Sequence, residues 1–170
     1  MTEEECLLNP KAIKVIGLGN VLCQDDGLGV YAVERLEEAL QDNEELVQDF
    51  TLVKAETDAW YGLQECLTSW QVIIIDALLG PGEPGTVYIV PLQEIVDTEW
   101  SYSMHGLTLL QLIARYQKEG KAIKGWLIGM EPERIDLGFG LSPVVEDNME
   151  ILLEEVKIMV ERMQGQGLYS

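Results

Sequence analysis

Short apolar, β-branched runs alternate along the chain with longer stretches in which apolar residues recur every three or four positions. The short runs are typical of buried strands, and the longer spacing is typical of helices that pack by one face. The runs predict five strands, at residues 13–18, 50–55, 71–79, 86–90 and 121–130. The helical spacing predicts four helices, at residues 27–40, 60–67, 105–116 and 143–163.

This alternation of strands and helices predicts an α/β fold. The strand at 71–79 is apolar on both faces, which places it at the centre of the sheet. Only residues 80–85 separate it from the next strand, too few for a helical crossover, so these two strands should be antiparallel. Ser142 and Pro143 suit the N-cap and first position of the last helix.

Length and composition favour one domain over residues 1–170, with loose termini at 1–10 and 164–170. Eleven Lys and Arg against thirty Asp and Glu give a net charge of −19, which argues against binding nucleic acid or an anionic membrane. No apolar run approaches the roughly 20 residues of a membrane helix. Three cysteines without a CxxC pair and an acidic N-terminus without a signal-like apolar stretch predict a reduced, cytoplasmic protein.

The chain contains one histidine, His105, which excludes HExxH motifs and every metal site that needs several imidazoles. His105 stands just before the apolar stripe of its predicted helix. There the helix dipole disfavours the imidazolium and leaves a neutral ring that can bind a metal ion. Ordinary hydrogen bonding at the start of a helix is the alternative interpretation.

Two acidic positions are candidates for the same chemistry. Asp25 and Asp26 follow the first strand, and an N-cap role explains one of them but not both. Asp76 lies in an apolar strand, where a buried carboxylate is costly unless it is paired or bound to a metal. If the first and third strands are neighbours, Asp26, Asp76 and His105 share one crevice at the carboxyl ends of the strands. Two carboxylates and one imidazole suit nickel or copper, and zinc is plausible.

Other motifs are weaker. The segment GLGN (residues 17–20) begins like a dinucleotide fingerprint but lacks its third glycine, so nucleotide or phosphate binding is the second interpretation. The chain has no GxSxG elbow and no P-loop. The acids near Cys23 would suppress its thiolate, so no separate nucleophile is identified.

Four segments, residues 15–36, 73–87, 101–112 and 129–156, resemble in order and spacing the successive blocks of the [NiFe]-hydrogenase maturation endopeptidases. The resemblance implies a three-layer α/β/α fold with a mixed, twisted five-stranded sheet whose fourth strand is antiparallel. It also implies a protease that removes the C-terminal extension of a [NiFe]-hydrogenase large-subunit precursor once nickel has been inserted.

The family motifs map onto Asp26, Asp76 and His105, which would recognise nickel carried by the precursor. Nickel then belongs to the substrate, although zinc or cadmium could replace it in crystals. The chain departs from the family at residues 54–58, where many members have an Asp-Gly-Gly turn, and Glu56 or Asp58 could supply a replacement carboxylate. A non-catalytic nickel-binding chaperone module is the remaining alternative, and a monomer is expected.

Overall fold

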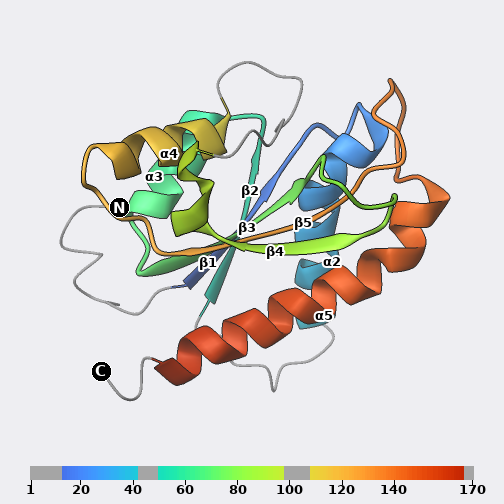
Figure 1. Cartoon of the computed structure of the whole chain (residues 1–170). Helices are drawn as coiled ribbons and strands as arrows, with labels where there is room; N and C mark the ends of the chain where they lie inside the picture. Colours follow the sequence, from blue (N-terminus) through green and yellow to red (C-terminus); the bar gives the residue numbers. More distant parts are fainter. Residues whose placement is uncertain (1–12, 42–49, 98–107, 167–170) are drawn as a thin grey trace.

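A computed structural model describes residues 13–41, 50–97 and 108–166 (Figure 1). These residues form strands, α-helices and two short 3-10 helices. In chain order the elements are β1 (Ile13–Leu18), η1 (Gln24–Gly27), α2 (Leu28–Gln41), β2 (Phe50–Glu56), α3 (Ala59–Leu67), β3 (Gln71–Ala77), β4 (Val87–Pro91), η2 (Leu92–Asp97), α4 (Leu109–Lys118), β5 (Gly125–Met130) and α5 (Pro143–Gln166).

The five strands form one mixed sheet in the order β2-β1-β3-β5-β4. The predicted central position of β3 and its pairing with β1 are both confirmed. β4 is antiparallel, as predicted, but it pairs with β5 and not with β3. The connection at residues 78–86 is long enough to pass the end of β5, because neighbouring strands lie only about 4.8 Å apart.

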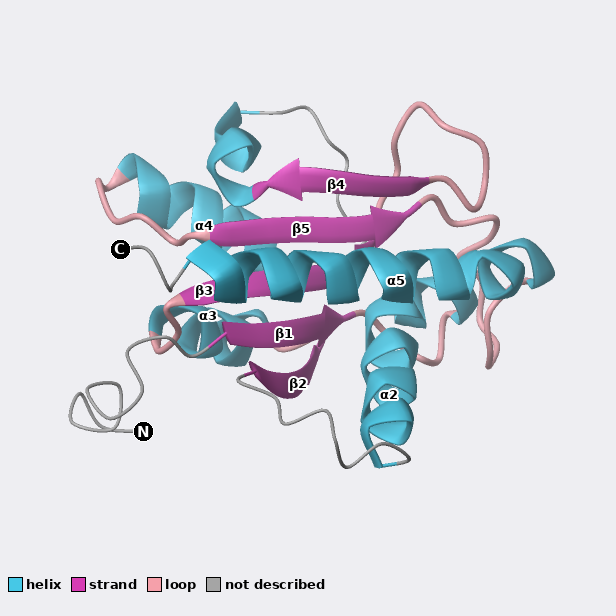
Figure 2. Ribbon diagram, turned by 90° about the horizontal axis from the view of Figure 1, so that it is seen from below, coloured by secondary structure: helices cyan, strands magenta, loops and turns pink. Residues whose placement is uncertain are grey.

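Helices cover both faces of the sheet, so the three-layer α/β/α prediction is confirmed (Figures 1 and 2). Figure 2 shows α2 and α5 on one face and α3 and α4 on the other. The predicted apolar stripe of the last helix is buried against the first of these faces: Val145, Met149, Leu152, Val156, Met159 and Met163. A second cluster joins α3, α4 and η2 to the opposite face.

Several element boundaries differ from the prediction. α4 begins at Leu109 and not at residue 105, because Thr108 caps it in a capping box with Gln111. β3 ends at Ala77, and β5 begins only at Gly125. α5 continues to Gln166, so the predicted loose tail is wrong for residues 164–166. None of the described helices is long and apolar enough to cross a membrane.

Close packing of α2 on the sheet depends on two glycines. A Cβ on Gly29 would overlap the carbonyl oxygens of Ile75 and Leu18, and a Cβ on Gly17 would overlap the carbonyl oxygen of Gly29. The backbone of α2 therefore lies directly against β1 and β3. This contact sets how the loop before α2 sits over the carboxyl end of β3.

Candidate active site

Asp26 and Asp76 meet at the carboxyl ends of neighbouring strands. Asp26 lies in η1, after β1, and Asp76 is the last residue but one of β3. Their exposed fractions are 3% and 6%, so both are buried. The charge of Asp26 contributes to raising the pKa of Asp76, which means that the two carboxylates interact. The structure thus brings together the two acids that the sequence selected.

The loop after β1 folds so that Asp26 is held in place. The backbone N–H of Asn20 donates to Oδ2 of Asp26 over 3.1 Å. Gly19 has φ +119°, and a Cβ there would collide with the carbonyl oxygen of Asp26. The Asn20 side chain accepts a hydrogen bond from the backbone N–H of Leu22. The GLGN motif therefore builds a tight turn around a carboxylate.

The same hydrogen bonds bear on the nucleotide-binding alternative. A phosphate cradle needs free backbone N–H groups. In this loop the N–H of Asn20 donates to Asp26, the N–H of Leu22 donates to the Asn20 side chain, and the N–H of Cys23 donates to the Asn20 carbonyl. With these donors engaged and a carboxylate in the turn, the loop favours a cation over a phosphate.

Asp76 is the most perturbed acid of the site. Burial is the main cause that raises its pKa to about 8, and the nearby charge of Asp26 adds to it. The backbone N–H of Ala77, which donates to Asp76 Oδ1 over 2.9 Å, acts in the opposite direction. At neutral pH Asp76 therefore keeps a proton, and a cation bound between the two acids would displace it. This donor set fits a divalent ion.

Asp25 has a different function from its neighbour. Its side chain is fully buried and accepts hydrogen bonds from the backbone N–H groups of Glu133, Arg134 and Ser142 and from the Ser142 hydroxyl. The carboxylate thereby ties the loop after β1 to the loop between β5 and α5. The N-cap interpretation therefore does not describe Asp25. Ser142 directly precedes α5, as predicted, and its hydroxyl donates to Asp25.

Glu131 is an acidic residue at this edge that sequence reasoning missed. It directly follows β5 and is 7% exposed. Its Oε2 accepts from the backbone N–H of Gly80 over 2.6 Å and from the Tyr88 hydroxyl over 2.7 Å. Burial and the hydrogen bond to Glu131 raise the pKa of the Tyr88 phenol. Glu131 anchors the loop that follows Asp76, and no sequence motif marks it.

His105, the third predicted ligand, lies outside the described residues and stays a prediction. The expected effect of the helix dipole on His105 required a helix that starts at residue 105, whereas α4 begins at Leu109. Within the described ranges, no group of three or more His, Cys, Asp or Glu side chains could hold a metal ion. The two buried acids thus need a third ligand from elsewhere.

The other candidate residues have ordinary roles. Asp58 caps α3 by accepting from the backbone N–H of Tyr61 over 2.9 Å. Glu56 is exposed at the end of β2. Cys23 and Cys66 are free thiols, and burial raises the pKa of Cys66 to about 12, which keeps that thiol protonated. None of these observations adds a nucleophile to the acid pair.

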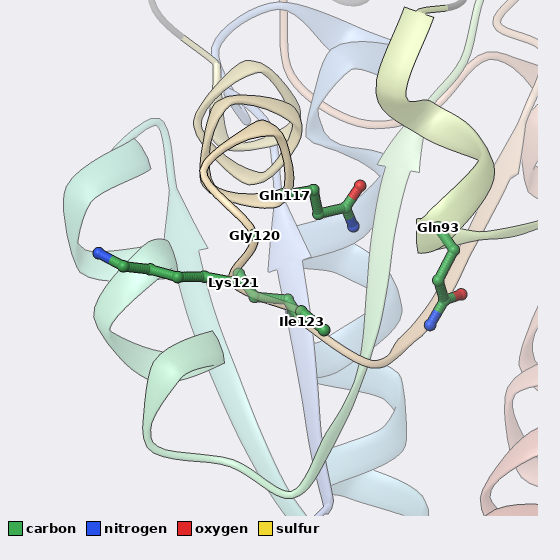
Figure 3. Close-up of a pocket in the computed structure, with 6 residues that line it drawn as sticks. Gln93, Gln117, Gly120, Lys121 and Ile123 are labelled. Atoms are coloured by element: carbon green, nitrogen blue, oxygen red, sulfur yellow. The ribbon is translucent and has the colours of Figure 1, made fainter.

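An open pocket of about 280 Å³ lies at the other end of the sheet (Figure 3). It is lined by Gln93 from η2, Gln117 from α4 and the 120–123 segment that leads into β5. Asp76 pairs in register with Gly129, near the carboxyl end of β5. The pocket is therefore separate from the acid pair.

Comparison with known proteins decides the family. The family sequence model for HycI, described as hydrogenase maturation protease, matches residues 30–158. The chain belongs to the hydrogenase maturation protease family. Hydrogenase 2 maturation protease of Escherichia coli is 30% identical over 148 residues, covering 85% of this chain and 87% of that protein. A putative hydrogenase maturation protease of Methanocaldococcus jannaschii is 29% identical over 134 residues, covering 76% of this chain and 78% of that protein.

Solved structures of hydrogenase maturation proteases have the same fold. The maturating endopeptidase HybD of E. coli superposes with a TM-score of 0.68 at 28% identity, covering 85% of this chain and 89% of that one. The [NiFe]-hydrogenase maturation protease HycI of Thermococcus kodakarensis gives a TM-score of 0.67 at 26% identity, covering 89% of this chain and 93% of that one. The fold and the protease family thus agree with the sequence prediction.

Proposed function

We propose that this protease removes the C-terminal extension of a [NiFe]-hydrogenase large-subunit precursor after nickel insertion, and that nickel in the precursor is its recognition element. The observation that carries the proposal is the buried acid pair Asp26 and Asp76, in a chain of this family. The related E. coli protein is named for the maturation of hydrogenase 2. The partner is then the precursor, met by a monomer in the cytoplasm, where the thiols stay reduced.

The acid pair is suited to a cation that arrives with the substrate. Before the precursor binds, the proton on Asp76 limits the repulsion between the two carboxylates. Nickel between them displaces this proton and gains two oxygen ligands, and His105 supplies an imidazole nitrogen. Nickel accepts such mixed oxygen and nitrogen ligands, and zinc or cadmium could occupy the same position in crystals.

Recognition of nickel would select the correct substrate and place the bond to be cut. The large-subunit precursor would be held only when its nickel is in place, so that an unfinished precursor is not processed. With the ion anchored on Asp26 and Asp76, the scissile carbonyl is held at a fixed position next to the water molecule that attacks it. The ion contributes by polarising that carbonyl or by positioning it.

The test compares nickel-loaded and nickel-free precursor. Purified protein is incubated with each form, and the intact mass of the precursor is followed with time. We expect loss of the C-terminal extension only from the nickel-loaded form. Binding without any change in mass would instead indicate the non-catalytic chaperone. Equal cleavage of both forms would leave a protease but contradict nickel recognition.

A further inference from the structure

Large exposed apolar side chains follow the ends of the strands that carry the acid pair and of their neighbours in the sheet. Nine large hydrophobic residues in the described part of the chain are exposed. Six of them follow the carboxyl ends of the parallel strands, in loops or in the first turn of α3: Leu22, Trp60, Tyr61, Leu79, Leu137 and Phe139. The two most exposed are Leu137, at 90%, and Phe139, at 80%. Both belong to the loop that Asp25 anchors.

Leu22, Leu137 and Phe139 form what we call the apolar rim. The backbone N–H of Gly138 donates to the Leu22 carbonyl over 2.9 Å, and the Gly138 carbonyl accepts from the N–H of Gln24 over 3.0 Å. Cys23 and Gly138 form a parallel bridge. These contacts fix the two loops side by side, so the rim side chains protrude from a tied backbone.

Apolar side chains that are exposed to water on such a fixed backbone are typical of a contact with another protein. The rim side chains are exposed, Leu137 by 90% and Phe139 by 80%, whereas a small molecule binds in a pocket that buries most of its surface. A second copy of this chain would bring another net charge of −19 and be repelled, as would an anionic membrane. The rim therefore favours a different protein.

We propose that the apolar rim docks the folded body of the hydrogenase precursor while its nickel reaches Asp26 and Asp76. This inference rests on the proposed function and assigns it a binding surface. Leu22 lies four residues before Asp26, and the loop of Leu137 and Phe139 is hydrogen-bonded to Asp25. A partner seated on the rim therefore lies beside the acid pair, and docking and nickel recognition act on one substrate.

The double variant Leu137→Gln/Phe139→Gln tests the proposal. Both side chains are exposed, so the fold should be kept, and an unchanged melting temperature checks this. We expect the dissociation constant for nickel-loaded precursor and the KM of processing to rise about 10- to 100-fold, with kcat nearly unchanged. Leu22→Gln, on the facing loop, should weaken binding in the same direction. Ile151→Gln, which replaces an exposed residue of α5, is the matched control and should match the wild type.

Three outcomes would overturn the docking proposal. The first is wild-type KM in both rim variants, in a preparation where the wild-type protein processes the precursor. That result would leave the proposed function standing. The second is a loss of self-association in the variants, measured by sedimentation, because it would assign the rim to a second copy of this chain. The third is failure of the wild-type protein itself to bind or process the precursor, which removes the proposed function as well.

Discussion

Ser142 donates both its backbone N–H and its hydroxyl to the carboxylate of Asp25, over 2.6 and 2.8 Å. These two hydrogen bonds join the loop after β1 to the start of α5. Two further backbone N–H groups, of Glu133 and Arg134, complete the shell around this buried carboxylate. The charge of the adjacent Asp26 instead acts on Asp76, whose pKa it helps to raise. Neighbouring acids in one turn therefore have separate tasks: Asp25 stabilises the loops, and Asp26 is the acid that we propose binds the nickel of the precursor.

Replacing Asp25 should destabilise the protein strongly. Asp25→Asn keeps the shape but turns an amide NH₂ toward groups that are themselves donors. We expect the free energy of unfolding to fall by about 3 kcal/mol or more, because buried donors lose a charged acceptor. Ser142→Ala removes only one of the four hydrogen bonds and should cost about 1 kcal/mol. Urea unfolding measures both, and equal losses would contradict the central role of Asp25.

The contact of α2 with the sheet predicts a second effect. Gly29→Ala places a methyl group against the carbonyl oxygens of Ile75 and Leu18, so the helix must move away from the strands. We expect a loss of about 2 kcal/mol or more in unfolding free energy, together with reduced processing, because η1, which carries Asp26, directly precedes this helix. Gly165→Ala is the matched control, since nothing lies within 4 Å of that position. In α5 it should be neutral or stabilise by up to about 1 kcal/mol. Similar behaviour of the two variants in thermal unfolding would refute the packing argument.

The raised pKa of Asp76 predicts how stability varies with pH. Folded Asp76 keeps its proton up to about pH 8, whereas the unfolded chain releases it near pH 3.8. Between these values the unfolded state binds fewer protons, so this group's stabilising contribution is lost as the pH rises, by at most about 1.4 kcal/mol per pH unit. Asp76→Asn has no such proton to lose.

The measurement is urea unfolding of both proteins at several values between pH 5 and pH 8, in chelator-treated buffer. The stability of the Asp76→Asn variant relative to the wild type should increase steadily with pH. A difference that stays constant across the range would mean that Asp76 is ionised in the folded protein throughout.

The sequence predicted the parts of the fold that depend on local patterns. The apolar run of β3 placed that strand at the centre of the sheet, and the acid within it marked the site. The position of Asp26 followed once β1 and β3 were taken as neighbours. The capping box of Thr108 and Gln111 was also readable in the sequence, but the prediction extended the helix back to His105.

The remaining features depend on contacts between distant segments. Asp25 and Ser142 are 117 residues apart in the sequence, and no spacing motif links them. Glu131 is one of many acids, and only the packing of β4 on β5 brings Tyr88 and Gly80 to it. The pairing of β4 with β5 likewise depends on the 78–86 loop, which is long enough to place β4 beside β3 or beside β5. A single sequence carries no signal for such pairings.

The central claim is that Asp26, Asp76 and His105 together hold the nickel of the precursor. The most direct test is the initial rate at which nickel-loaded precursor loses its extension, measured by intact mass for Asp26→Asn, Asp76→Asn and His105→Gln. Asp147→Asn, an exposed acid on α5, is the control for loss of one charge. We predict that each site variant is slowed at least about 100-fold while the control keeps the wild-type rate. Processing at the wild-type rate by any one of the three site variants would contradict the account.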